Sequence, residues 1–238
     1  MPSRLAPLLP RPVAFAHRGA RAHAPENTIE AFRLALRLGA TGLESDVWLS
    51  ADGDAVLDHD GVVGRWPRRR PVAQVQRADL PGAMPTLDEL FSACGSGFDL
   101  SLDLKDPASF DVVVGLCRTL ADPARVWICH PDLDLLTDWR RRDTGVRLVH
   151  SWRTARMSRG LERHAADLAE LGIDALNLPV EEWTGGAVTL CHRFDRLAFA
   201  WDAQHERQLL EVLDMGIDAV YSDYVDRLVD ALGRVHGS

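Results

Sequence analysis

The sequence predicts an α/β fold, a single (β/α)8 barrel that spans residues 1–238. Short apolar runs alternate with segments of helical periodicity from one end of the chain to the other. Eight strand–helix pairs are the number that closes a barrel of this kind. No linker-like or low-complexity tract interrupts the alternation, and a length of 238 residues is typical of one such barrel.

The elements follow from the apolar patterns in chain order. Strands are expected at residues 13–17, 42–49, 98–104, 125–130, 147–152, 175–178, 197–201 and 219–222. Helices are expected between and after them, at residues 27–38, 86–93, 107–120, 132–141, 157–171, 181–192, 205–215 and 224–235. In the first helix Ile29, Phe32 and Leu36 share one face, and Thr28 or Asn27 can cap its start. The helix at 181–192 is the weakest, because Gly185-Gly186 breaks its pattern.

One segment departs from the simple alternation, and it predicts a β-hairpin after the second strand. Residues 50–54, Ser-Ala-Asp-Gly-Asp, separate two apolar runs. They are too few for a parallel crossover but suit a hairpin turn. The second arm therefore folds back antiparallel, with Asp58 level with Asp46 and His59 level with Ser45 and Glu44. This hairpin would return His59 to the acidic residues of the second strand.

Composition excludes several classes of function. A net charge of −8 argues against a nucleic-acid partner, because the chain offers no basic face to backbone phosphates. The local exception is the arginine-rich run at 65–70, which we expect to be a solvated loop. No segment has the roughly 18 consecutive apolar residues of a membrane span, and residues 1–11 lack the apolar stretch of a signal peptide.

The cysteines indicate the compartment. Cys94, Cys117, Cys129 and Cys191 are widely spaced and show no zinc-ligand pattern. We expect buried free thiols and a cytoplasmic protein. The sequence makes no prediction of oligomeric state.

Two acidic residues on the second strand are the first candidate metal ligands. Glu44 and Asp46 are two positions apart, so both side chains point to the same face of a strand. Facing the barrel interior, they would form a costly pair of buried negative charges unless a cation lay between them. Oxygen ligands of this kind suit Mg²⁺ or Ca²⁺. The alternative is a solvated pair on an exposed strand.

The third strand repeats this logic. In Leu100-Ser101-Leu102-Asp103-Leu104-Lys105 the leucines form one face, which leaves Ser101, Asp103 and Lys105 to point into the barrel. Lys105 is the one lysine among 27 basic residues. A third metal ligand beside an ammonium group that binds phosphate would explain these polar residues. A structural Asp–Lys ion pair is the alternative.

Histidines complete the candidate chemistry. His17 and His59 could serve as general acid and base next to the carboxylates, and Arg18 could bind a phosphate. Trp201 could pack against a small polyol or belong to the core. The other histidines are expected to be structural, although His130 and His150 each end or nearly end a predicted strand.

Taken together, these motifs resemble the glycerophosphodiester phosphodiesterase family. The resemblance rests on His17-Arg18-Gly19, Pro25-Glu26-Asn27-Thr28, Glu44-x-Asp46, His59-Asp60, Pro85-Thr86-Leu87-Asp88-Glu89, Asp103-Leu104-Lys105, Trp201 and residues 216–223. Each motif is weak alone, but their order and spacing are specific, and they run through nearly the whole chain.

The resemblance implies a TIM barrel and a metal-dependent phosphodiesterase. It implies that His17 and His59 are the acid/base pair, and that the metal ligands are Glu44, Asp46 and the residue at position 103. Arg18, Lys105 and Trp201 would bind the substrate. In the mechanism usually drawn for the family, a glycerol hydroxyl attacks phosphorus and expels the alcohol, and water then opens the cyclic phosphate to give glycerol 3-phosphate.

Three departures from the family pattern bear on metal and substrate. Asp103 stands where the family usually has glutamate, Asp202 stands where it has a neutral residue, and Cys129-His130-Pro131 replaces a strand that ends in Ser-Phe. Two alternatives therefore stay open. One is a related phospholipase D-like or phosphoinositide-cleaving activity, and the other is a non-catalytic phosphodiester-binding protein.

Overall fold

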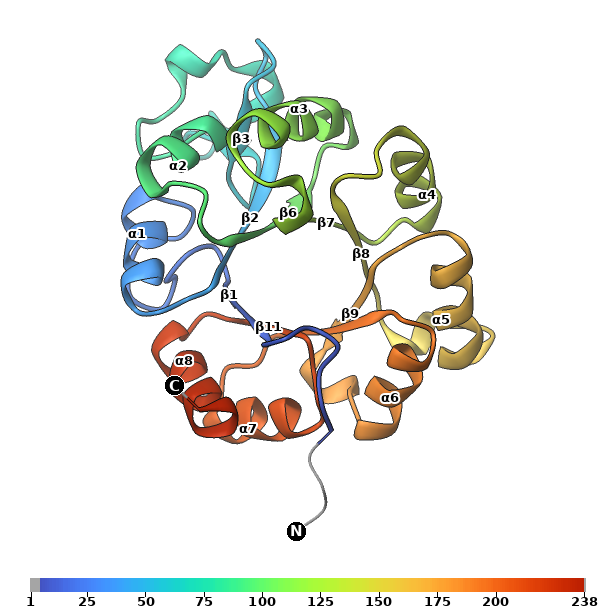
Figure 1. Cartoon of the computed structure of the whole chain (residues 1–238). Coiled ribbons are helices and arrows are strands. Elements are labelled where there is room, and N and C mark those ends of the chain that lie inside the picture. The colour runs from blue at the N-terminus through green and yellow to red at the C-terminus, as the bar shows by residue number, and fades with distance from the viewer. Residues whose placement is uncertain (1–4, 238) are drawn as a thin grey trace.

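Eight parallel strands close into a barrel in the computed structural model, which describes residues 5–237. The strands follow one another around the barrel in chain order, and β1 closes it by pairing with both β2 and β11. Figure 1 shows the helices as a ring outside the strands. The predicted fold class is confirmed. The barrel strands are β1 (Val13–Ala16), β2 (Gly42–Leu49), β6 (Asp99–Leu104), β7 (Val126–His130), β8 (Arg147–Ser151), β9 (Ala175–Pro179), β10 (Leu197–Trp201) and β11 (Ala219–Ser222).

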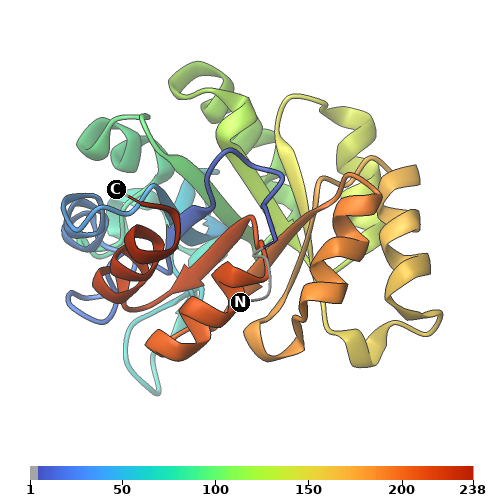
Figure 2. The ribbon, with the colours of Figure 1, turned by 60° about the horizontal axis from the view of Figure 1, so that its bottom comes forward.

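A helix follows each barrel strand and covers its outer face, as the side view in Figure 2 also shows. The apolar faces of the helices pack on the outward-facing leucines, valines and alanines of the barrel strands. No helix in the described part of the chain is both long and apolar enough to cross a membrane. The helices are α1 (Ile29–Arg37), α2 (Leu87–Cys94), α3 (Phe110–Leu120), α4 (Leu133–Arg142), α5 (Gly160–Glu170), α6 (Gly185–Arg193), α7 (Glu206–Asp214) and α8 (Val225–His236).

The expected helix at 181–192 begins later than its apolar pattern indicates. Residues 180–182 form a separate 3-10 turn, and α6 starts at Gly185. Thr184 caps α6, because its hydroxyl oxygen accepts a hydrogen bond from the Ala187 N–H. Gly185-Gly186 therefore occupies the first turn of the helix instead of interrupting its middle.

The hairpin after β2 has the predicted register. Strand β3 (Ala55–Leu57) runs antiparallel to β2 with Leu57 opposite Val47, and the Asp58 N–H donates to the Asp46 carbonyl oxygen at 3.1 Å. The chain then forms a second, small hairpin of β4 (Val62–Val63) and β5 (Arg70–Pro71). The arginine-rich run between these two strands is exposed, as expected.

Aromatic side chains fill the barrel interior and give it a solid floor. Phe15 stacks on Tyr221 with ring centroids 4.7 Å apart, and Trp127 meets Phe199 edge-on at 5.0 Å. Gly42 leaves room for this packing, since a Cβ there would lie 2.5 Å from the Phe15 ring. The Asp99 carboxylate, at the start of β6, accepts a hydrogen bond from the Trp127 Nε1 at 2.9 Å.

A buried carboxylate ties the N-terminal segment to the other end of the barrel. Asp218 is fully buried just before β11. One of its oxygens accepts hydrogen bonds from the N–H groups of Leu8 and Leu9 at 2.7 and 3.1 Å. The other accepts from the Ala198 N–H and pairs with the His192 Nε2, both at 2.8 Å. Four donors therefore depend on one side chain.

Replacing Asp218 with alanine should lower the free energy of unfolding by about 3–5 kcal/mol, because it leaves several buried donors without a hydrogen-bond acceptor. Urea denaturation followed by circular dichroism measures the change. Asp230→Ala, at an exposed position on α8, is the matched control and should change the midpoint little. Equal midpoints for the two variants would show that Asp218 does not anchor the segment.

Candidate active site

A tight turn after β1 directs His17 and Arg18 into the carboxyl end of the barrel. The His17 N–H still donates to the Ser222 carbonyl oxygen at 3.1 Å, which continues the β1–β11 pairing. The backbone then turns through left-handed conformations, with φ of 50° at Arg18 and 78° at Gly19. A Cβ at Gly19 would lie 2.8 Å from the Ala31 Cβ, so only glycine fits against α1.

Asn27 links the same loop to β2. Its Oδ1 accepts a hydrogen bond from the Ser45 hydroxyl at 2.7 Å, and its backbone N–H donates to the Arg18 carbonyl oxygen at 3.0 Å. Asn27 is buried and has a φ of 52°, a conformation that asparagine tolerates better than most residues. The Pro25–Thr28 motif is thereby explained as the support of the His17-Arg18-Gly19 turn.

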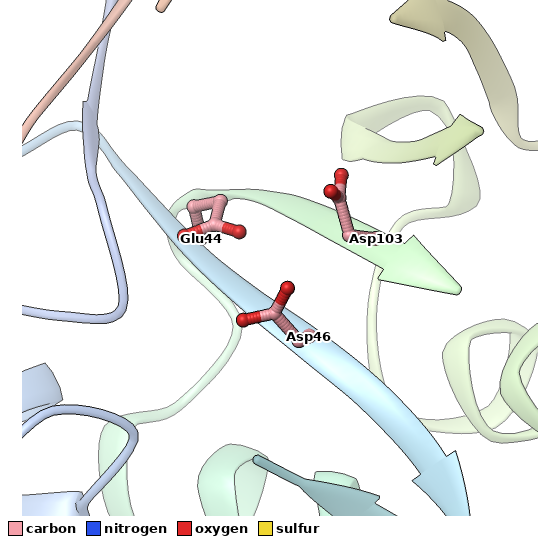
Figure 3. A group of neighbouring side chains, drawn as sticks. All are labelled: Glu44, Asp46 and Asp103. Carbon is pink, nitrogen blue, oxygen red and sulfur yellow. The ribbon is translucent and has the colours of Figure 1, made fainter. Parts of the chain in front are cut away.

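Three carboxylates meet beside this turn. Glu44 and Asp46 come from β2 and Asp103 from the adjacent β6, where it stands directly opposite Asp46 in the strand register (Figure 3). One oxygen of each lies within 4.8 Å of the others. Oxygens that bind one Ca²⁺ ion at about 2.4 Å cannot be more than about 5 Å apart, so this spacing is compatible with a shared cation. The shorter Asp103 side chain still reaches the cluster.

The cluster has the chemistry of a hard-cation site. Glu44 and Asp46 are almost completely buried, and the Asp46 Oδ2 has no hydrogen-bond partner among the described residues. Burial raises the pKa of Glu44 far above its ordinary value, and the like charges of Asp46 and Asp103 raise it further against the opposing effect of His17. The Arg18 Nε lies 3.5 Å from the Asp46 Oδ2 without a hydrogen bond to it. A divalent cation would coordinate this oxygen and relieve the crowding of negative charge, so these residues fit Mg²⁺ or Ca²⁺.

Two basic side chains border the carboxylates. The Lys105 Nζ lies 2.9 Å from the Asp46 Oδ1 and 3.2 Å from the Asp103 Oδ2. Burial lowers the pKa of Lys105, but these two carboxylates raise it more, so the ammonium group stays charged. The Arg18 N–H donates to the Glu44 Oε2 at 2.7 Å, while its guanidinium pairs with Glu26 at 3.0 Å. The Asp–Lys ion pair, which the sequence offered as the alternative to a metal ligand, and the acidic cluster therefore coexist.

His17 is held in one orientation by a residue that the sequence did not single out for a role. Its Nδ1 lies 2.6 Å from the Asp223 Oδ1, and its Nε2 lies 3.9 Å from the Glu44 Oε2. An Nδ1–H donated to Asp223 leaves the Nε2 free to accept a proton on the side of the acidic cluster. Burial lowers the pKa of His17, but the Glu44 and Asp223 carboxylates raise it above its ordinary value.

His59 lies on the hairpin beside β2 and outside the cavity wall. It follows the hairpin arm β3, and its backbone carbonyl oxygen accepts a hydrogen bond from the Trp48 Nε1 at 3.4 Å. Its Nδ1 lies 2.9 Å from the Asp60 Oδ1, and its side chain is 39% exposed. The hairpin runs back from the carboxyl end of β2 and brings His59 level with Ser45, where its side chain is more open to solvent than that of His17.

A cavity of about 450 Å³ opens at the carboxyl ends of the strands. Five predicted site residues line it: His17, Arg18, Glu44, Asp103 and Trp201. Asp46, Lys105 and His59 are not part of its wall. Asp46 is buried, Lys105 contacts Asp46 and Asp103, and the His59 side chain contacts Asp60. Asp202 lines the cavity, whereas His130 and His150 do not.

Further lining residues come from three barrel strands, at Ser151, Asn177 and Tyr221, and from the loops that follow the strands. They are Pro131, Ser151, Trp152, Arg153, Arg156, Asn177, Gln204 and Tyr221. Asp223 directly follows a predicted strand and Trp152 is the last residue of one, and residues at the carboxyl ends of barrel strands form the active sites of this fold. That position is the signal that sequence reasoning could have used for both.

Comparison with known proteins identifies the family. Residues 17–227 match the model of the family described as the glycerophosphoryl diester phosphodiesterase family. The chain belongs to this family. The matched range begins at His17 and includes every residue of the acidic cluster. The chain is thus placed in a family of phosphoric diester hydrolases, and the resemblance seen in the motifs is confirmed.

Individual relatives agree with this assignment. The chain is 29% identical over 245 residues to the protein named "Probable glycerophosphodiester phosphodiesterase 2" of Mycobacterium tuberculosis, covering 92% of this chain and 90% of that one. The glycerophosphodiester phosphodiesterase structure from Thermotoga maritima superposes with a TM-score of 0.81 at 24% identity, over 92% of this chain and 98% of that one. A phosphodiesterase of Oleispira antarctica, solved with the product sn-glycerol-3-phosphate, has a TM-score of 0.80 at 23% identity, over 93% and 97% of the two chains.

Proposed function

We propose that this glycerophosphodiester phosphodiesterase family member hydrolyses glycerophosphodiesters to glycerol 3-phosphate and an alcohol. The observation that carries the proposal is the cluster of Glu44, Asp46 and Asp103 facing the Nε2 side of His17. The product bound to the Oleispira antarctica relative supports a glycerol phosphate ligand. The substrate is a small molecule that fits a cavity of about 450 Å³.

The acidic cluster would hold one divalent cation, Mg²⁺ or Ca²⁺. When bound, the cation supplies Lewis-acid stabilisation of the negative charge on the phosphate. Lys105 keeps Asp46 and Asp103 in place and offsets part of their charge. Arg18 lines the cavity next to Glu44 and is the guanidinium available to a phosphate oxygen, and Trp201 offers an apolar wall to the glycerol carbons.

The two histidines would divide the proton transfers. In the first step the His17 Nε2 removes the proton from the glycerol hydroxyl, whose oxygen forms a bond to phosphorus. The bond from phosphorus to the departing alcohol breaks, and His59 gives that alcohol a proton. In the second step His59 takes a proton from water, the water oxygen binds phosphorus, and the ring bond breaks. His17 returns its proton to the glycerol oxygen, so both histidines end as they began.

The direct test is release of glycerol 3-phosphate from glycerophosphocholine and glycerophosphoethanolamine. We expect release with Mg²⁺ or Ca²⁺ and a loss of at least roughly 100-fold with EDTA, since the cation stabilises the transition-state charge. An enzyme-coupled assay of glycerol 3-phosphate measures both.

Re-adding the cation to the EDTA-treated protein is the control and should restore the rate. Circular dichroism before and after chelation shows whether the fold is intact. Release that EDTA does not affect would contradict the metal requirement. Absence of release from either substrate by folded, metal-supplied protein would contradict the proposed reaction.

A further inference from the structure

Two tryptophan side chains line the part of the cavity away from the acidic cluster. Trp152, which follows β8, and Trp201, the last residue of β10, contribute two indole rings to it. With the phosphate at the acidic cluster and the glycerol carbons against Trp201, the departing alcohol of the substrate would extend toward Trp152. The groups around the two rings therefore determine which alcohol fits.

Guanidinium groups already cover both rings. The Arg153 Cζ lies 4.9 Å from the Trp201 ring centroid, and the Arg156 Cζ lies 5.4 Å from the Trp152 ring centroid. Both distances are within the range of a cation–π contact. A quaternary ammonium such as choline is recognised through the same aromatic faces. Here it would meet a positive charge on each ring.

The two arginines differ in how their charge is balanced. The Arg153 guanidinium lies 3.5 Å from Glu182 and 4.0 Å from Glu181, so acidic neighbours compensate it. Arg156 is exposed, and among residues 5–237 it forms no ion pair. Arg18 and Arg153 of the same cavity both have carboxylate partners among these residues, so Arg156 differs from them in having none.

The loop holds Arg156 in position. Residues 154–156 form a 3-10 turn in which the Arg156 N–H donates to the Arg153 carbonyl oxygen at 3.0 Å. The Thr154 N–H donates to the Glu182 carboxylate at 2.6 Å, which fixes the turn to the loop after β9. Arg156 therefore approaches the ligand from an anchored backbone.

A second hollow of about 540 Å³ adjoins the first and shares Pro131, Trp152 and Arg156 with it. No uncompensated positive charge other than Arg156 faces it from the described residues that line it. Arg159 pairs with Asp167 at 2.7 Å. Burial and the neighbouring His164 lower the pKa of His150 to about 4, so His150 is neutral at pH 7. Arg156 thus lies at the junction of two hollows.

We propose that Arg156 binds a negative charge carried by the departing alcohol, so that the preferred glycerophosphodiesters have a head group with its own phosphate or carboxylate. The inference rests on the proposed hydrolytic function and specifies its substrate class. Charge-assisted hydrogen bonds from a guanidinium to either group are the expected contact. Asp202 carries the opposite charge in the same cavity, where it accepts a hydrogen bond from the Gln204 side chain at 3.2 Å. A cationic head group would instead bind to the Asp202 carboxylate.

Two matched pairs of substrates test the proposal. Glycerophosphoserine differs from glycerophosphoethanolamine by one carboxylate, and bis(glycerophospho)glycerol differs from glycerophosphoglycerol by a second phosphodiester. We expect kcat/KM to be about five-fold higher for the anionic member of at least one pair, the size of one partly exposed charge contact. The pair that shows the preference identifies carboxylate or phosphate as the recognised group.

In Arg156→Gln this ratio should fall to about one, whereas Arg163→Gln, which removes an exposed arginine of α5, should leave the ratio unchanged. A wild-type ratio near one, or a ratio that Arg156→Gln does not alter, overturns the proposal. So does a preference for glycerophosphocholine that Asp202→Asn removes. If none of the substrates is cleaved, the proposed hydrolytic function fails, which distinguishes that outcome from a failure of Arg156 alone.

Discussion

Replacing His17 with alanine should lower kcat by at least roughly 100-fold while the barrel remains folded. The expected loss is large because Asp223 locks the imidazole so that its Nε2 faces the acidic cluster, and no other described side chain in the cavity combines a proton acceptor with that position. Initial rates of glycerol 3-phosphate release at saturating substrate measure the effect.

His23→Ala is the matched control for this experiment. His23 lies six residues further along the same loop, where its Nε2 pairs with Asp226 at 3.0 Å. Its loss should leave kcat within about two-fold of the wild-type value, as is usual for a surface substitution. A His17→Ala variant with near-normal kcat and native circular dichroism would remove this histidine from the reaction.

Glu44→Gln should lower the affinity for Mg²⁺ or Ca²⁺ by roughly 100-fold or more, because it deletes one of three charged ligands without changing the size of the side chain. The same variant should raise the melting temperature of the metal-free protein. Burial and the like charges of Asp46 and Asp103 disfavour the ionised form of Glu44 in the folded state, as its raised pKa indicates. An uncharged amide removes that penalty above the pKa of the unfolded carboxyl.

Thermal unfolding with and without added cation measures both effects. The wild type should gain stability on addition of Mg²⁺ or Ca²⁺, and Glu44→Gln should not. Glu30→Gln, at an exposed position in the first turn of α1, is the control and should respond as the wild type does. An equal cation-induced shift in wild type and Glu44→Gln would show that Glu44 is not a ligand.

The fold was predictable because each barrel strand is a short apolar run and each helix has one apolar face. The expected boundaries of β2, β10 and β11 agree with the structure at both ends. The hairpin after β2 was predictable from an Asp-Gly turn and the period of two along a strand, which together fixed Asp58 opposite Asp46. Local spacing was sufficient in each case.

The acidic cluster was also predictable from local spacing, whereas the side chains that contact it from other loops were not. Glu44 and Asp46 share a strand, and Asp103 follows from alternation on the next one. Asp223 contacts His17 across 206 residues of sequence, and this contact exists only because β11 closes the barrel against β1. Contacts between strand-end loops depend on the closed geometry, which periodicity does not encode.

The contacts of Lys105 were predictable only in part. A lone lysine facing the interior predicts a phosphate ligand, and this stays a prediction, while the structure adds that the ammonium group lies between Asp46 and Asp103. The sequence did not predict a role for Arg153 or Arg156, because they lie in a loop that is rich in arginine, like much of the chain. Their positions over Trp201 and Trp152 emerged only from the folded loop.

The aromatic floor of Phe15, Trp127, Phe199 and Tyr221 fills the barrel interior, and the Tyr221 side chain also lines the cavity. The interior is therefore a packed core and not a pore. Under the proposed function, substrate would enter and both products would leave on the side of the carboxyl ends of the strands. The aromatic floor would thus set the direction of traffic, although it takes no part in the bond-making steps.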